Sequence, residues 1–295
     1  MIITPRESII EILCPAKVNL YLEVKGRRPD GYHELETLMQ TVSIYDRLVL
    51  TRSDAGIEIK CSDAVIPCGP ENTVWRAAEE VRLATGCTGG VSVLIEKRIP
   101  AGGGLGGGSS DAAGMIAGLN LLWKLGLSKA RMEEIGRRVG SDVPFFFTGA
   151  AAVCRGRGEL VTAMDGLPEP LHLVVVYPGF RVSTREVYGR LKMDLTVYSV
   201  DDNMCKLTNN LRCGKAMSIV PWLFNRLERT AAEVCPELDA VKRAMARVGL
   251  LGVTMSGSGS CFFGLCERKE VAIEKAEHLV ASGVAFAIAC ESTRE

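Results

Sequence analysis

A run of glycines in the first half of the chain constrains its fold more than any other feature. Six glycines flank one leucine within residues 102–108. Glycine loses more backbone freedom on folding than other residues, so such a run is retained where a backbone must be approached closely. Alternating Val91, Val93 and Ile95 precede it, and an apolar segment, 109–125, follows it. This order predicts a strand, a glycine loop and a helix.

A glycine loop that opens a helix is suited to bind an anion. The N–H groups of the first helical turn have no partners within the helix, and the helix dipole is positive there. A flexible linker has a similar composition, but it would not join a strand to an apolar helix. We therefore predict a phosphate-binding loop. Its residues are Pro100, Ala101, Gly102, Gly103, Gly104, Leu105, Gly106, Gly107, Gly108, Ser109 and Ser110.

Three common nucleotide-binding patterns do not fit this loop. No G-x-x-x-x-G-K-[ST] segment occurs, which excludes a Walker A loop. Gly102, Gly104 and Gly107 satisfy G-x-G-x-x-G, but a dinucleotide site also needs an acidic residue about 20 positions further on. Residues 112–132 contain no acidic residue. The H-R-D and D-F-G segments of protein kinases are also missing.

Length and composition indicate a globular protein of two lobes. A chain of 295 residues is long for one core. The formal net charge is zero, so charge gives no argument for a nucleic-acid partner. The eleven cysteines include no C-x-x-C pair and the histidines are far apart, which argues against a zinc site and favours a reducing compartment. No signal peptide and no apolar run of about 18 residues is found, so we expect a cytoplasmic protein without membrane contact.

Strands and helices are mixed without strict alternation, which favours an α+β fold. Alternation over 18–24 predicts a strand, and further strands are expected at 47–51, 56–61, 171–177, 252–255, 261–265 and 284–290. Helices are expected at 71–84, 109–125, from the cap Ser128 to Gly140, and at 217–232, 236–247 and 268–281. The stretch Asp165-Gly166-Leu167-Pro168 suggests domains at 1–165 and 166–295.

Three separated motifs resemble those of the GHMP kinase superfamily, which includes galactokinase, homoserine kinase and mevalonate kinase. They are the segment 15–20 (Pro-Ala-Lys-Val-Asn-Leu), the glycine loop, and the segment 255–261 (Met-Ser-Gly-Ser-Gly-Ser-Cys). The resemblance implies a two-lobe α+β kinase fold, with the phosphate loop between a strand and a helix of an N-terminal ATP-binding domain. It also implies ATP and Mg²⁺ as cofactors, and a second glycine loop that packs against the first.

Within the superfamily, the triple-glycine form of the loop is similar to that of kinases acting on 4-diphosphocytidyl-2-C-methyl-D-erythritol. So are the segments 27–35, 140–146, 225–228 and 236–238. This resemblance implies phosphoryl transfer from ATP to the 2-hydroxyl of that alcohol, in non-mevalonate isoprenoid synthesis. Asp111 and Arg226 depart from the residues usual there, Asn and Asp. Another GHMP kinase, for mevalonate or homoserine, and a non-catalytic nucleotide sensor remain alternatives.

The resemblance implies two catalytic residues, Lys17 and Asp142. Lys17 and Asn19 are two apart on a predicted strand, so they face the same side. A cation there would lower the pKa of the attacking hydroxyl and balance charge on the transferred phosphoryl group. Asp142 would accept the hydroxyl proton or orient the alcohol. The alternatives are a lysine on the solvated side of a strand, and an aspartate that caps the turn at Pro144.

The remaining roles also follow from the resemblance. The substrate-binding residues would be Asn19, Tyr32, His33, Thr184 and Tyr188, with Tyr188 stacked on the cytosine and His33 at its edge. Met39 replaces a phenylalanine of some relatives, which weakens a full aromatic sandwich. Lys97 and Asn72 would lie on the adenosine side, and Ser110 is a candidate ligand of Mg²⁺, since no carboxylate cluster is evident. We expect a small-molecule substrate, no nucleic acid, and a monomer or weak homodimer.

Overall fold

The computed structural model describes residues 1–6, 8–165, 167–192, 201–214 and 216–294. Two compact units interleave along the chain. The first unit comprises residues 1–16, 44–101 and 106–149, and the second comprises 17–43, 102–105 and 150–295. Strands β2 (Ile9–Arg27) and β3 (His33–Ser53) therefore contribute residues to both units. The domain boundary after residue 165 stays a prediction, because each compact unit draws on several stretches of sequence.

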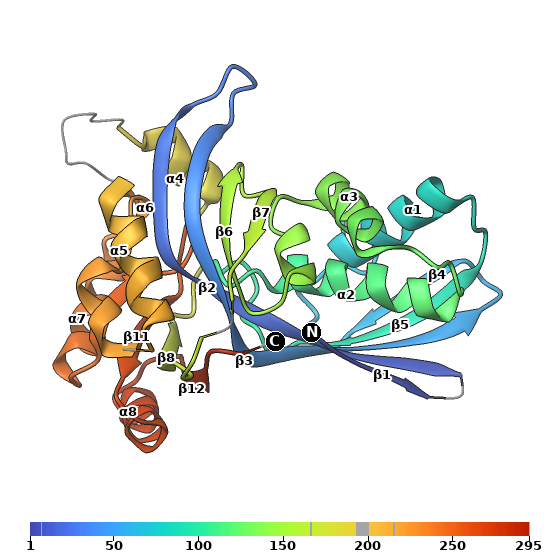
Figure 1. The fold of residues 1–295 in the computed structure, drawn as a ribbon. Helices are drawn as coiled ribbons and strands as arrows, with labels where there is room; N and C mark the ends of the chain where they lie inside the picture. Colours follow the sequence, from blue (N-terminus) through green and yellow to red (C-terminus); the bar gives the residue numbers. More distant parts are fainter. Residues whose placement is uncertain (7, 166, 193–200, 215, 295) are drawn as a thin grey trace. The chain divides into compact units, whose positions relative to one another are not determined.

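The first unit combines strands with three α-helices. Its strands are β1 (Ile2–Arg6), the start of β2, the end of β3, β4 (Ile57–Cys61) and β5 (Gly90–Glu96). β5 pairs antiparallel with β3 and parallel with β4. Its helices are α1 (Thr73–Thr85), α2 (Gly107–Leu122), α3 (Lys129–Val139) and the 3₁₀ helix η1 (Pro144–Phe147). In Figure 1 the helices α1 to α3 lie on one side of β4 and β5.

The second unit contains the end of β2 and the start of β3 together with a separate four-stranded sheet. β6 (Ala151–Gly156) pairs with β3 and β7 (Leu160–Ala163), and the two-residue strand β9 (Phe224–Asn225) pairs parallel with β2. The separate sheet has the order β10 (Leu251–Met255), β11 (Phe262–Cys266), β8 (His172–Tyr177), β12 (Phe286–Glu291). The helices are α4 (Thr184–Arg190), α5 (Asp201–Arg212), η2 (Ala216–Trp222), α6 (Leu227–Val234), α7 (Glu237–Arg247) and α8 (Lys269–Ala281).

Apolar periodicity predicted most of these elements correctly. In α1 the buried residues Val74, Ala77, Ala78 and Val81 follow helical spacing. The buried core of the second unit is drawn from alternate strand residues, such as Val174 and Val176 of β8, and from helix residues, such as Leu227 and Leu238. The predicted α+β class is confirmed. Among the described residues, no helix combines the length and the apolar character needed to cross a bilayer.

The predicted helix at 217–232 is wrong. This stretch forms the 3₁₀ helix η2, the short strand β9 and only then the helix α6. Pro221 lies inside η2 and lacks the N–H that a continuous α-helix requires. Asn225 instead pairs with Leu22 of β2, so tertiary pairing interrupts the helix that the apolar spacing favours. No sequence pattern predicted α4, α5, β6 or β7.

Candidate active site

Lys17 and Asn19 lie on β2 in the second unit, and their side chains are in contact. Lys17 Nζ donates to Asn19 Oδ1 at 2.6 Å and to the carbonyl oxygen of Gly104 at 2.9 Å. Asn19 Nδ2 donates to Thr37 Oγ1 at 2.8 Å. The predicted shared side of the strand is therefore confirmed. Lys17 is only 3% exposed, so it is not the solvated surface lysine of the alternative interpretation.

The two glycine loops pack against each other. We call residues 100–110 the first glycine loop and residues 255–260 the second. Ser256 Oγ donates to the carbonyl oxygen of Gly104 at 3.0 Å, and the Cys261 N–H donates to that of Gly103 at 3.0 Å. Gly104 has a φ of +83°, and a Cβ there would lie 2.1 Å from the carbonyl oxygen of Ser256. Only glycine fits this crossing, and the predicted packing of the second loop against the first is confirmed.

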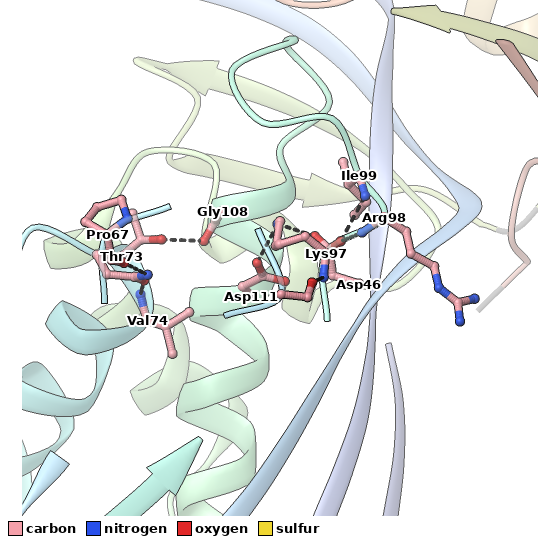
Figure 2. Close-up of polar contacts among 11 residues, drawn as sticks. Asp46, Pro67, Thr73, Val74, Lys97, Arg98, Ile99, Gly108 and Asp111 are labelled. Carbon is pink, nitrogen blue, oxygen red and sulfur yellow. Dashed lines mark hydrogen bonds and ion pairs between the residues drawn. The ribbon is translucent and has the colours of Figure 1, made fainter. Parts of the chain in front are cut away.

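The first glycine loop runs into α2 in the first unit. Gly106 precedes the helix in the left-handed region, with a φ of +71°. Thr73 Oγ1 donates to the carbonyl oxygen of Gly108 at 2.9 Å, a contact drawn in Figure 2. Ser110 Oγ is buried without a hydrogen-bond partner among the described residues. An unpaired buried hydroxyl is costly, which makes this atom a candidate contact for a ligand at the helix start.

Lys97 lies in a buried cluster of charges in the first unit, shown in Figure 2. Its Nζ contacts Asp46 Oδ2 and lies 2.8 Å from Asp111 Oδ2. Asp46 Oδ1 also accepts from the N–H groups of Arg98 at 2.6 Å and Ile99 at 2.9 Å. The cluster therefore fixes the chain that leads from β5 into the first glycine loop. The predicted adenosine contact of Lys97 stays a prediction, because its amine is engaged here by two carboxylates.

The pKa values of Lys97 and Asp111 are shifted upwards. Burial lowers the pKa of Lys97 because it favours the neutral amine. The negative charges of Asp111 and Asp46 have the larger combined effect and raise this pKa above its ordinary value. Burial raises the pKa of Asp111 to about 7, against the opposing effect of Lys97. Two carboxylates that share one ammonium group leave a net negative charge, and burial makes that charge costly.

Asn72, which is predicted to lie on the adenosine side, caps helix α1. Its Oδ1 accepts from the Val74 N–H at 2.8 Å, and its Nδ2 donates to the Pro67 carbonyl at 2.6 Å. Both ends of the amide are thus used by the protein. A contact of Asn72 with nucleotide stays a prediction, and its capping role is sufficient to explain its position.

The residues predicted to hold the cytidine meet in the second unit. The rings of His33 and Tyr188 are 5.0 Å apart and inclined at 34°. Burial and the nearby Arg27 lower the pKa of His33, so its imidazole is neutral at pH 7 and offers one donor and one acceptor. Thr184 Oγ1 lies 2.7 Å from Ser258 Oγ, which connects α4 to the second glycine loop.

Asp142 lies in the first unit, in the turn between α3 and η1. The 3₁₀ helix η1 starts at Pro144, directly after Val143, and no side chain caps it. The alternative role of Asp142 as a cap is therefore not supported. Its catalytic role stays a prediction.

Sequence reasoning missed two arginines beside the predicted residues. The guanidinium of Arg157 lies 4.7 Å from the ring centre of Tyr32, which is otherwise exposed. A Cβ at Gly102 would lie 2.9 Å from Cδ of Arg181, so this arginine lies against the first glycine loop. Neither arginine belongs to a recognisable motif, and only the tertiary structure places them. The described residues contain no group of three or more His, Cys, Asp or Glu side chains suited to a metal ion.

Comparison with known proteins places this arrangement in one class. The family model for the N-terminal domain of GHMP kinases matches residues 72–150, and that for the C-terminal domain matches 209–285. A crystal structure of a homoserine kinase from Cytophaga hutchinsonii shares the fold, with a TM-score of 0.77 over all of this chain and 97% of that chain, at 20% identity. The fold and the two family matches are those of a GHMP kinase, an enzyme that phosphorylates a small molecule.

The more similar relatives narrow the class. A 4-diphosphocytidyl-2-C-methyl-D-erythritol kinase from Pelotomaculum thermopropionicum is 42% identical over 90% of this chain and 91% of its own length. A crystal structure of a 4-(cytidine 5'-diphospho)-2C-methyl-D-erythritol kinase is 41% identical, with a TM-score of 0.82 over 96% of this chain and 99% of that one. The chain belongs to the family of 4-diphosphocytidyl-2-C-methyl-D-erythritol kinases.

Proposed function

We propose that this chain transfers the γ-phosphoryl group of ATP to the 2-hydroxyl of 4-diphosphocytidyl-2-C-methyl-D-erythritol. The observation that carries the proposal is the buried Lys17, which lies where the two glycine loops cross. Sequence identity above 40% along nearly the whole chain supports the same substrate class. Relatives that use mevalonate or homoserine share the fold at much lower identity, so their substrates are not favoured.

Lys17 and Asp142 would carry the chemistry. The Lys17 ammonium group is held by Asn19 and Gly104, so its position is fixed before substrate binds. A fixed cation stabilises the alkoxide that forms at the substrate and the charge on the transferred group without reorganising. Asp142 would accept the hydroxyl proton or orient the alcohol.

The helix start at α2 fits the phosphates of ATP and a magnesium ion. Ser110 offers a buried hydroxyl without a partner among the described residues, and the first turn of α2 offers N–H groups beside it. Mg²⁺ held there would neutralise part of the charge of the phosphates. The chain itself would supply Ser110 as a ligand and the glycine backbone as the phosphate cradle.

The rings of His33 and Tyr188 would bind the cytosine. A neutral imidazole can donate to or accept from the base edge, and the phenol ring can stack on its face. Stacking on a base contributes about 1–3 kcal/mol by alanine substitution. Tyr188→Ala should therefore raise KM for the cytidylyl substrate by about 5- to 150-fold and leave KM for ATP nearly unchanged, while Tyr188→Phe should be almost silent. Equal damage to both KM values would assign Tyr188 a packing role only.

A substrate panel tests the proposed activity. The protein is incubated with ATP, Mg²⁺ and, in separate reactions, the cytidylyl alcohol, mevalonate and homoserine, and ADP formation is followed. We expect turnover with the cytidylyl alcohol alone. Turnover with mevalonate or homoserine instead would replace the proposed substrate, and ATP binding without turnover of any alcohol would favour a nucleotide sensor. ATP with Mg²⁺ should also raise the melting temperature, and NAD should not.

A further inference from the structure

The segment 225–228, Asn-Arg-Leu-Glu, is held against the second glycine loop. Asn225 is buried on β9, and its Nδ2 donates to the carbonyl oxygens of Met255 at 2.7 Å and Gly257 at 2.8 Å. Glu228 Oε2 accepts from the Met255 N–H at 2.9 Å. Two side chains at the start of α6 thus hold the backbone of the loop, and both Nδ2 hydrogens of Asn225 are used for this purpose.

The second glycine loop in turn contacts the group around Lys17. A Cβ at Gly257 would lie 3.5 Å from Lys17 Nζ and 3.2 Å from the carbonyl oxygen of Gly104. Ser256 Oγ donates to that same Gly104 oxygen, which also accepts from Lys17 Nζ. A shift of the second glycine loop would therefore displace Gly104, whose carbonyl oxygen accepts from Lys17 Nζ, and would move the backbone of Gly257 beside the lysine.

We infer that Asn225 is a positioning residue for Lys17 and acts on it through the second glycine loop. This inference rests on the proposed function, because it takes Lys17 as catalytic. Asn225 holds two carbonyl groups on either side of Ser256, so it fixes the direction in which the Ser256 hydroxyl points. Since Lys17 stabilises charge that develops only during the reaction, a displaced loop lowers kcat more than it raises KM.

The substitution Asn225→Asp removes the two donor bonds and adds a negative charge, and the control below adds the same charge elsewhere. An aspartate has the same shape and still offers an oxygen to the Leu227 N–H, which Asn225 Oδ1 accepts from at 2.9 Å. Its second oxygen faces the carbonyl oxygens of Met255 and Gly257, which therefore lose the N–H donors that the asparagine amide supplied. We expect kcat to fall about 10- to 100-fold, the scale of a small misplacement of a reacting group, with both KM values changed less than about threefold.

A matched control separates positioning from general stability. Asn120 in the first unit bonds the backbone of Leu127 through both ends of its amide, at 2.8 and 3.2 Å. Asn120→Asp makes the same chemical change near the end of α2, and no hydrogen bond in the described structure joins this side chain to either glycine loop. It should lower the melting temperature and leave kcat of the folded protein unchanged. If Asn225→Asp does not fold, Asn225→Ser keeps an oxygen for Leu227 but is too short to bond both carbonyls.

A double-mutant cycle with Ser256→Ala tests the route. If Asn225 acts through the loop, Ser256→Ala should lower kcat in the natural background and have little further effect beside Asn225→Asp. Independent effects that multiply would overturn the inference. Lys17→Ala is measured in parallel. If it keeps full activity, the proposed function fails; if it is inactive while Asn225→Asp keeps full kcat, only the positioning role fails.

Discussion

Two buried lysines, one in each compact unit, have different partners. Lys97 in the first unit bonds the carboxylates of Asp46 and Asp111. Lys17 in the second unit bonds the amide oxygen of Asn19 and the carbonyl oxygen of Gly104, which carry no formal charge. Both amines are nearly inaccessible. Two carboxylates bond the first, and two uncharged oxygens help to orient the second.

This difference separates a structural ion cluster from a candidate catalytic cation. Carboxylates bonded to Lys97 raise its pKa and keep the ammonium occupied. The oxygens of Asn19 and Gly104 fix the position of the Lys17 amine beside the two glycine loops, where its field can act on a bound phosphate. Burial alone would not distinguish the two residues. The position of each amine does. Lys97 lies between two buried carboxylates and Lys17 lies where the two glycine loops cross, which predicts loss of stability for one substitution and loss of turnover for the other.

The largest expected effect is on stability, from Lys97→Met. The methionine keeps the apolar stem but leaves Asp46 and Asp111 buried without their cation. Breaking a buried ion pair by removing one partner typically costs about 3–5 kcal/mol. Urea unfolding at pH 7 measures the loss, with Lys60→Met on the exposed side of β4 as the matched control. A loss as small as that of the control would mean that the cluster is not a structural lock.

The next effect is on turnover, from Lys17→Met. Removing a positioned charge from an active site typically lowers kcat by at least about a hundredfold. The Asn19 and Gly104 oxygens that lose this donor are uncharged, so each costs less to leave unpaired than a buried carboxylate does. Steady-state kinetics and circular dichroism on the same sample test both statements. If Lys17→Met unfolds the protein as Lys97→Met does while the folded fraction keeps its kcat, the comparison between the two lysines is wrong.

Much of the Lys17 site is readable in the sequence because its residues lie in short motifs. Residues two apart on a strand share a side, and this rule alone predicts that Lys17 lies beside Asn19. The rule does not predict that both faces of this part of β2 are buried. Nor does it predict the bond from Ser256 to Gly104, whose residues are 152 positions apart. Contacts at such separation depend on how the strands pair, which local patterns do not encode.

The Lys97 cluster is beyond sequence reasoning. Asp46 lies in an alternating strand pattern where an acidic residue usually faces water, yet it is fully buried. Its partner Lys97 is 51 positions away, across the pairing of β3 with β5. In the sequence, Asp111 stands out only as a charge beside the phosphate loop. The same limit explains the error at 217–232, where apolar spacing favours a helix and pairing of β9 with β2 interrupts it.

The smallest expected effect is the change in stability for each pH unit that Asp111→Asn produces. It reports the net negative charge of the cluster formed by Lys97, Asp46 and Asp111. Burial raises the pKa of Asp111 to about 7, above the ordinary value of 3.8. Between these values the folded protein binds a proton that the unfolded chain has released. This group therefore stabilises the fold most below about pH 4, and its contribution is lost as pH rises towards 7. Asparagine does not titrate, so this dependence disappears in the variant.

We therefore expect the stability of Asp111→Asn relative to the natural protein to rise from pH 4 to pH 7, by about 1 kcal/mol per pH unit. Urea unfolding of both proteins across this range gives the difference directly, and all other titrating groups cancel to the extent that the substitution leaves them unchanged.

The groups facing Asp111 are Asp46, Lys97 and the buried thiol of Cys14, whose pKa is raised well above its ordinary value by burial and by both aspartates. A difference independent of pH would mean that Asp111 is ionised throughout, and that Lys97 balances both carboxylates. The opposite slope would mean that Lys97 lowers the pKa of Asp111 more than burial raises it, and the first unit would then hold a favourable ion triad in place of a strained one.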